Sequence, residues 1–344
     1  MTCIIYNEFK GYCLNTDDDS QFINSEKLTC GINELPWDFY LPNKLIEENN
    51  EETQQQEQCN KKLTKSEKRG IRQSKRINAS RKKQLQRANS NDEEEIIQFN
   101  SYLAKQEIKK IYKNLVGAGK QDKKILQYHS IALYKSDIEH FLPNEWFNDN
   151  NISMIYELIK NLFITKQNKQ FSNQIVLLFP SLIQLFLHFP GDAQDLLPLD
   201  DLKKSKFIFL PINFIDEPVE MDLEQANNGD HWVLGILSLL DNTLYIYDSM
   251  KIDDDQVSEA QLQNLIVKFE NCKQLVHGKI KINYIETDQQ KNFDDCGVYV
   301  IMISCFLINQ FIFQNEINLD ISKIKFNPLE ARLYILKTLT RLVE

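Results

Sequence analysis

Short apolar runs alternate with helical repeats throughout residues 126–344, and this alternation constrains the fold of the chain most strongly. The runs are rich in β-branched and aromatic residues and lie at 175–179, 207–214, 232–240, 244–247 and 280–285. Between or after them, apolar residues recur at helical spacing at 152–163, 181–188, 258–271, 297–313 and 328–343. Because strands and helices are both present and interleaved, the sequence predicts a mixed α+β domain.

The first 125 residues have a different character. Residues 1 to about 90 lack a sustained period and contain acidic and Gln-rich runs, which is typical of a largely disordered region. The segment 61–87 holds twelve Lys or Arg residues against one acid, Glu67, and so carries +11; the whole chain carries −9, so the remainder carries −20. We expect this basic segment to bind a nuclear import receptor or nucleic acid, or else to be a solvated charge run.

A helix and a linker separate this region from the patterned part of the chain. Apolar residues recur at helical spacing from Ile97 to Leu115, and Gly117 follows as a cap, which predicts an amphipathic helix over 95–116. A linker then ends near Ile125. We therefore expect an N-terminal region of residues 1–125 and one folded domain of residues 126–344.

Several classes of protein are disfavoured by what the sequence lacks. No N-terminal stretch has the pattern of a secretory signal, so we expect the chain in the nucleus or the cytoplasm. The most apolar run, 297–313, contains Ser304, Asn309 and Gln310, so we expect no membrane span. The seven cysteines form neither a disulfide framework nor a zinc-binding Cys-x-x-Cys pair, so we expect no metal and no cofactor.

Cys296 stands where a reactive thiol is expected. A thiol attacks as the thiolate, which a helix N-terminus stabilises, and Cys296 opens the apolar helix after the polar run 289–292. The small Gly297 beside it is expected to let a substrate backbone approach. Cys305 lies deeper in the same helix and is expected to be an ordinary buried thiol. That is also the alternative interpretation of Cys296.

His231 and Asp248 end two neighbouring apolar runs. His231 precedes the run 232–240, and Asp248 follows the run 244–247. If the runs form an antiparallel hairpin with its turn at Asp241-Asn242, both side chains lie at its open end. A carboxylate there orients the imidazole and stabilises its protonated form, as a catalytic triad requires. The alternative is a surface His and a turn Asp with no shared role.

Three motifs in this order resemble those of the Ulp/sentrin-specific cysteine protease family. They are His231-Trp232, then Tyr247-Asp248-Ser249, then Gln290 followed six residues on by Cys296 within Asp295-Cys296-Gly297. A fourth element, Trp146-Phe147-Asn148-Asp149, resembles the family's Trp-Leu-Asn-Asp segment. The resemblance covers roughly residues 127–344 and leaves the N-terminal region unexplained.

The resemblance implies a fold, an activity and four catalytic roles. The fold is papain-like, of the Ulp type, with a central mixed sheet flanked by helices and the catalytic cysteine at a helix N-terminus. The activity is hydrolysis after the C-terminal Gly-Gly of a ubiquitin-like modifier, in precursors, in conjugates with lysine, or in both. By position, Cys296 is the nucleophile, His231 the general base and acid, Asp248 the orienting acid and Gln290 an oxyanion-hole donor. Gln289 is the alternative donor.

The resemblance also implies substrate contacts. Trp146 and Trp232 correspond to two indoles that close a narrow tunnel over the Gly-Gly tail, although both could be core aromatics instead. Asp149 matches a position that contacts the modifier in relatives, and a helix N-cap is its alternative role. The long, polar connection 215–230 and the segment Leu196-Leu197-Pro198-Leu199-Asp200 resemble the deneddylase branch of the family, which implies a Nedd-type modifier. The segment Tyr247-Asp248-Ser249-Met250 also suits a SUMO protease, which is the alternative.

Two positions depart from the family pattern. Relatives usually have an aromatic residue two positions before the cysteine, whereas this chain has Asp294 there and Phe293 one position earlier. An added carboxylate near the nucleophile would disfavour the thiolate and slow the enzyme. Phe147 replaces the usual Leu, which changes core volume only. The Asp294 departure supports the alternative of a pseudoprotease that only binds a modifier. An acetyltransferase of related fold is a further alternative, but it needs a cofactor site that the sequence does not show.

Overall fold

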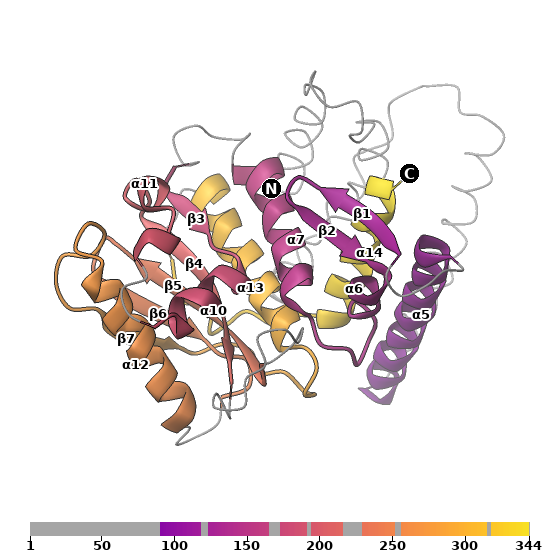
Figure 1. The fold of residues 1–344 in the computed structure, drawn as a ribbon. Helices are drawn as coiled ribbons and strands as arrows, with labels where there is room; N and C mark the ends of the chain where they lie inside the picture. Colours follow the sequence, from indigo (N-terminus) through magenta and orange to yellow (C-terminus); the bar gives the residue numbers. More distant parts are fainter. Residues whose placement is uncertain are drawn as a thin grey trace, which may run out of the picture.

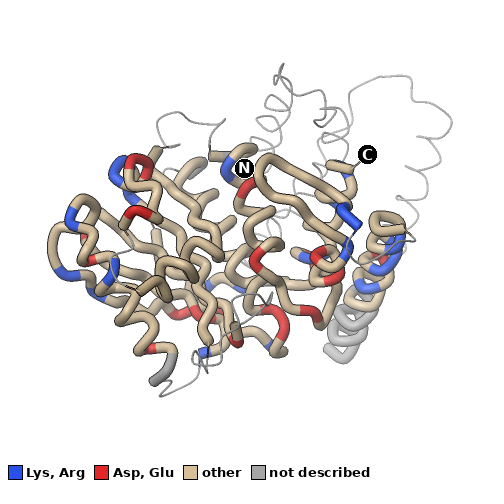
Figure 2. The backbone as a smooth tube through the Cα atoms, viewed as in Figure 1, with Lys and Arg blue, Asp and Glu red and all other residues tan. Residues whose placement is uncertain are grey.

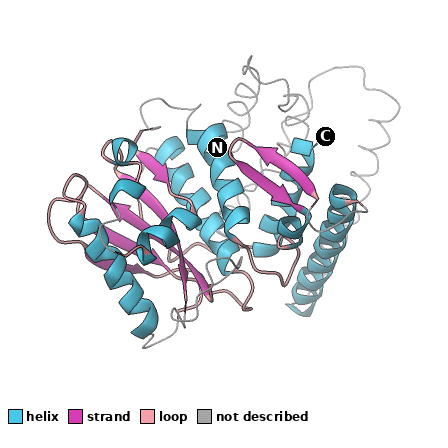
Figure 3. Cartoon of the chain, viewed as in Figure 1, coloured by secondary structure: helices cyan, strands magenta, loops and turns pink. Residues whose placement is uncertain are grey.

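The computed structural model describes residues 90–117, 123–164, 173–190, 194–215, 229–251, 256–314 and 318–343. These residues form the mixed α+β architecture that the sequence predicts (Figures 1 and 3). The basic segment 61–87 and most of the connection 215–230 lie outside the described residues. No helix in the described part is both long and apolar enough to cross a membrane.

A five-stranded mixed sheet forms the centre of the molecule. Its order is β3-β4-β5-β6-β7, with antiparallel pairing around β5 and parallel pairing of each outer strand with its neighbour. The five predicted strands are thus confirmed. Their bounds are Ile175–Leu177 (β3), Phe207–Phe214 (β4), His231–Ser238 (β5), Thr243–Tyr247 (β6) and Lys281–Ile285 (β7).

Helices cover both faces of this sheet. Two of them, α10 (Pro180–His188) and α12 (Gln256–Asn271), pack with one apolar cluster, while α7 (Asp149–Ile159), α13 (Cys296–Asn309) and α14 (Pro328–Val343) belong to the other. All eight residues of β4 are buried, because a strand covered on both faces needs a continuous apolar sequence. Short elements complete this part: η4 (Lys160–Ile164), η5 (Gln194–Leu196), α11 (Leu199–Leu202) and η7 (Gln310–Gln314).

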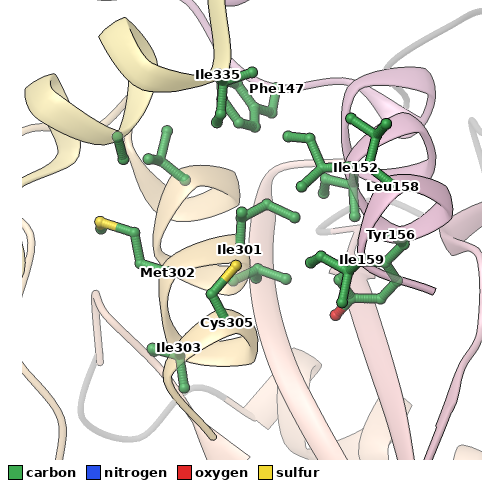
Figure 4. Close-up of a cluster of buried hydrophobic side chains, with 14 of the residues drawn as sticks. Phe147, Ile152, Tyr156, Leu158, Ile159, Ile301, Met302, Ile303, Cys305 and Ile335 are labelled. Atoms are coloured by element: carbon green, nitrogen blue, oxygen red, sulfur yellow. The ribbon is translucent and has the colours of Figure 1, made fainter. Parts of the chain in front are cut away.

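Helix α13 is buried along its whole length, which explains why its sequence is apolar on every face. Figure 4 shows Ile301 and Cys305 of this helix among side chains of α7, including Ile152. The Tyr156 hydroxyl is 2.8 Å from the Ser304 hydroxyl, so a hydrogen bond also joins the two helices. This packing fixes the direction of α13 and therefore the position of Cys296 at its first turn.

A hairpin before α7 was not predicted from the sequence. It consists of β1 (Lys124–Tyr128) and β2 (Ile131–Tyr134), followed by α6 (Lys135–Glu139). The turn lies at His129-Ser130, and His129 has a φ of 47°, a conformation for which Asn or Gly is the usual residue. The sequence therefore gives no hairpin signal at this point.

Helix α5 (Ser90–Val116) belongs to the packed body of the molecule. It starts earlier than the predicted 95 and lies beside α14 (Figure 1), with Ala104, Ile108 and Leu115 buried in the same apolar cluster as α13. Its described outer face is rich in Lys (Figure 2). A boundary at residue 126 therefore divides one packed unit, because the apolar stripe of α5 needs α14 to bury it.

Replacing Ile108 by alanine tests this packing. Ile108 of α5 is fully buried against the core, so Ile108→Ala should lower the free energy of unfolding by roughly 2–5 kcal/mol. The exposed neighbour Lys109 provides the control, and Lys109→Ala should change it by less than about 0.5 kcal/mol. Urea unfolding of both variants measures the difference. Equal values for the two would show that α5 is not part of the cooperative unit.

Candidate active site

Cys296 is the first residue of α13, as the sequence predicts. Asp295 precedes the helix, and its carbonyl accepts the hydrogen bond from the Tyr299 N–H that closes the first turn. The Cys296 side chain is only 1% exposed. Unpaired N–H groups at a helix N-terminus place partial positive charge beside this sulfur, which favours its anionic form.

Gly297 has a packing role that was not predicted from the sequence. A Cβ atom at this position would lie 2.8 Å from Cβ of Phe147 and 3.3 Å from Cδ1 of Trp232. The space beside Gly297 is therefore filled by two aromatic side chains of the protein. Glycine is needed here because it lets α13 approach these side chains. The approach of a substrate backbone at Gly297 stays a prediction.

His231 and Asp248 meet as predicted. His231 begins β5 and Asp248 follows β6, and these antiparallel strands are joined through the turn at Asp241-Asn242, where Asn242 has a φ of 51°. The distance from His231 Nε2 to Asp248 Oδ1 is 2.7 Å. The same carboxylate oxygen accepts a 2.8 Å hydrogen bond from the backbone N–H of Met250. The carboxylate is thus held in place and oriented towards the imidazole.

Electrostatic interactions keep His231 protonated at neutral pH. Burial alone would lower the pKa of His231, but the hydrogen bond to Asp248 and the interaction with the Cys296 thiol raise it to about 9. The other ring nitrogen, Nδ1, is buried and has no hydrogen bond of good geometry within the described residues, although the Cys296 thiol is close enough to raise the pKa of His231. A cationic imidazole beside the thiol provides the environment in which a thiolate forms.

The side chain of Gln290 is fixed beside Ser249 and Met250, the residues that follow Asp248. Its Oε1 accepts from the Ser249 hydroxyl at 2.8 Å, and its Nε2 donates to the Asn292 carbonyl at 2.8 Å. The remaining N–H lies near Met250 sulfur at 3.6 Å, a weak acceptor. Gln289, by contrast, donates to the carbonyls of Asp248 and Thr287. Of the two amides, Gln290 is therefore the one with an N–H that is easily released.

The two tryptophans differ in exposure. Trp232 is 3% exposed, and its indole N–H donates to the Phe147 carbonyl at 2.9 Å, so it holds the segment before α7 against the sheet. Trp146 is only half-buried, and its indole N–H donates to Asp294 Oδ1 at 3.0 Å. The structure thus brings both indoles close to the start of α13. Trp232 is also a core aromatic, as the alternative interpretation proposed.

Asp149 is not the N-cap of α7. That position is taken by Asn148, whose side chain accepts from the Asn151 N–H while the Asn151 side chain accepts from the Asn148 N–H. Asp149 is the first helical residue and remains partly exposed, and burial raises the pKa of its carboxyl. The predicted local role of Asp149 is therefore wrong, because a capping box one residue earlier satisfies the helix.

Arg332 of α14 was missed by the sequence analysis. Its side chain is 1% exposed and forms an ion pair of 2.8 Å with Asp295, the residue before Cys296. A signal for it exists, because Arg332 lies one and two turns from Leu336 and Leu339 and so falls on the buried stripe of the helix. A charged residue on such a stripe must have a partner of opposite charge or hydrogen-bond acceptors, so this position predicts a buried ion pair.

The described residues contain three free thiols and no cluster of metal-binding side chains. No group of three or more His, Cys, Asp or Glu side chains in this part of the chain is placed to hold a metal ion. Cys272, Cys296 and Cys305 are free thiols. Burial raises the pKa of Cys305 to about 12, so this second thiol of α13 is protonated at neutral pH.

A thiol at a helix N-terminus beside a carboxylate-bound imidazole, on a mixed sheet with helices on both faces, defines the class of cysteine proteases. The particular family follows from comparison with known proteins. The model of the Ulp1 protease family, C-terminal catalytic domain, matches residues 145–329, so the chain belongs to this family. The expected Ulp-type fold is confirmed.

Two fission yeast proteins are similar in sequence to part of the chain. NEDD8-specific protease 2 of Schizosaccharomyces pombe is 28% identical over 63% of this chain and 50% of the relative. NEDD8-specific protease 1 of the same organism is 28% identical over 55% of this chain and 42% of the relative. Among solved structures, the C-terminal Ulp1 protease domain in complex with Smt3, the yeast ortholog of SUMO, aligns with 69% of this chain and 93% of that chain at 20% identity and a TM-score of 0.45. The chain thus spans half or less of the length of the two fission yeast relatives.

Proposed function

We propose that this chain is a thiol protease that hydrolyses the bond after the C-terminal Gly-Gly of a ubiquitin-like modifier. The observation that carries this proposal is the geometry at one end of the sheet, where the 2.7 Å pair of His231 and Asp248 lies beside Cys296 at a helix N-terminus. Both maturation of precursors and removal of the modifier from lysine fit this chemistry, because each breaks a bond from a glycine carbonyl to nitrogen.

The proposed reaction assigns one task to each group. The Cys296 thiolate attacks the glycine carbonyl, and the N–H groups of Gln290 and of the first turn of α13 stabilise the oxyanion. His231 then donates the Nδ1 proton to the leaving amine, which breaks the carbon–nitrogen bond and leaves a thioester. In the second half, His231 takes a proton from water as the oxygen attacks the thioester. The products are the free glycine carboxyl group and the regenerated thiolate.

A Nedd-type modifier is the substrate we propose. Two relatives that each match more than half of this chain are named NEDD8-specific proteases, and the polar connection 215–230 and the segment 196–200 point in the same direction. A SUMO-type modifier is the alternative. We further propose that the chain acts in the nucleus or the cytoplasm and that the basic segment 61–87 directs its location through an import receptor or nucleic acid.

Asp294, the feature that favoured a pseudoprotease, has a partner other than the nucleophile. Its carboxylate accepts from the Trp146 indole, and no direct hydrogen bond to Cys296 is present among the described contacts. This contact gives the Asp294 carboxylate a structural role, which favours an active protease over the alternative of a catalytically impaired binder. His231 interacts with both Asp248 and Cys296, and Gln290 is hydrogen-bonded to Ser249, the residue after Asp248.

Hydrolysis of a panel of modifiers tests the proposed function. Nedd-type, SUMO-type and ubiquitin substrates, each with a fluorogenic amine on the terminal glycine, are compared by kcat/KM. We expect the Nedd-type substrate to react fastest, SUMO second and ubiquitin poorly, and a Gly-Ala terminus to react far more slowly than Gly-Gly. Equal rates for Nedd-type and SUMO would reject the preference while leaving the protease assignment intact. No hydrolysis of any substrate would reject the assignment itself.

A further inference from the structure

Two chain segments contact one another next to the start of α13, where Cys296 lies. One, residues 140–146, leads from α6 to the half-buried Trp146; the other, residues 289–295, leads from β7 to Cys296. We name them the Trp146 segment and the Cys296 segment. Neither segment is part of a helix or a strand, so side-chain contacts must fix the position of one segment relative to the other.

The buried side chain of Arg332 is hydrogen-bonded to both segments. Its guanidinium donates to the carbonyls of His140, Leu142 and Glu145 in the Trp146 segment at 2.8–3.0 Å. On the other side it donates to the Asp294 carbonyl at 3.0 Å and to Asp295 Oδ1 at 3.0 and 2.8 Å. Every N–H group of a buried guanidinium needs a partner, and these bonds supply them. The backbones of both segments are thus fixed relative to one another.

Asn292 makes the Cys296 segment rigid within itself. Its Oδ1 accepts from the backbone N–H groups of Asp294 and Asp295 at 3.1 and 3.2 Å, and its Nδ2 donates to Asp295 Oδ2 at 2.9 Å. Such a side-chain-to-backbone turn fixes the backbone direction at Asp294. The carboxylate of Asp294 is therefore presented from a defined position two residues before the nucleophile.

The Asp294 carboxylate binds the side chain of Trp146, which is partly exposed at this site. Trp232 and Phe147 are packed in the core, whereas Trp146 is half-exposed, and its polar anchor is the 3.0 Å hydrogen bond from its indole N–H to Asp294. An exposed indole without such an anchor samples several rotamers. An acceptor at this point selects one of them, close to the start of α13.

We propose that Asp294 is a positioning residue that holds the Trp146 indole in the orientation that receives the substrate tail. This inference rests on the proposed function and gives a use to one of the two positions where the chain departs from the family pattern. The carboxylate acts through its hydrogen bond to the indole and not through its charge on the Cys296 sulfur. Substrate binding should therefore depend on it more than the chemical step does.

The test compares Asp294→Ala with Asp294→Asn, since the Asn amide oxygen can still accept from the indole. With a fluorogenic Nedd-type substrate, Asp294→Ala should raise KM about tenfold with a small change in kcat, the scale of one hydrogen bond to a charged group, and Asp294→Asn should restore KM. In a Trp146→Phe background, which lacks the N–H, Asp294→Ala should add no further effect. The exposed Glu286→Ala serves as a charge-matched control with unchanged KM.

Two readouts separate this inference from the proposed function. The indole N–H resonance of Trp146, assigned by its loss in Trp146→Phe, should move in Asp294→Ala and remain close to its original position in Asp294→Asn, whether or not any modifier is cleaved. The rate of Cys296 alkylation by iodoacetamide should be the same in all three proteins. An unmoved resonance, or additive effects in the double variant, would overturn the inference. Faster alkylation in Asp294→Asn would overturn it too, since the charge would then be acting on the thiol.

Discussion

Replacing Cys296 by alanine should abolish hydrolysis of the proposed Nedd-type substrate, while the folded variant should still bind the modifier. The expected loss is on the order of 10⁶-fold in kcat, the scale seen when a covalent nucleophile is removed from a hydrolase. The side chain is small and 1% exposed at the start of α13, so the helix remains intact in Cys296→Ala. Turnover and modifier binding, each measured on the same preparation, give the comparison.

The matched controls are the two other free thiols of the described chain. Cys305 lies in the same helix with its pKa raised to about 12 by burial, and the Cys272 thiol donates to the Lys268 carbonyl at 3.4 Å. Cys305→Ala and Cys272→Ala should retain turnover, since neither thiol contacts His231. Turnover that survives Cys296→Ala, or that is lost in a folded control variant, would remove Cys296 from its proposed role.

Replacing Asp248 by asparagine has the second largest expected effect. Asp248→Asn keeps the size of the side chain but removes the charge that stabilises the imidazolium, so turnover should fall by roughly 10²–10⁴-fold. The raised pKa of His231, about 9, depends on this carboxylate, so the variant should have a lower pKa there. In the wild-type chain kcat/KM should fall as the pH rises through about 9 and His231 loses its proton. In Asp248→Asn that limb should move to lower pH.

Asp230→Asn is the control for this prediction, because Asp230 is an exposed carboxylate next to His231. Its removal changes the charge near the site but not the 2.7 Å pair with Asp248. We expect its pH profile to overlay that of the wild-type chain. Near-normal kinetics in Asp248→Asn would mean that another acid orients the imidazole.

The sequence predicted the elements whose patterns are local. The five strands of the sheet and the helices at 256–271, 296–309 and 328–343 follow from apolar spacing. The hairpin that brings His231 to Asp248 follows from the turn at Asp241-Asn242, since a polar pair between two apolar runs is itself a turn signal. The start of α13 at Cys296 follows from the change from a polar to an apolar run.

Features that depend on contacts distant in sequence could not be predicted. Arg332 is more than 180 residues from the carbonyls it binds at His140, Leu142 and Glu145, and no local pattern relates them. The packing of Gly297 against Phe147 has the same origin. Relatives usually have an aromatic residue two positions before the nucleophile, and this pattern gave no indication that Asp294 would bind an indole.

The site of covalent attachment tests the account most directly. The full chain is reacted with a Nedd-type modifier whose C-terminal glycine carries a thiol-reactive group, and the adduct is analysed by intact mass and by peptide mapping. We predict one modifier per chain, attached to the peptide that contains Cys296, even though the sequence has seven cysteines. Attachment to any other cysteine, or no attachment to a folded chain by any ubiquitin-like modifier, would contradict the central claim.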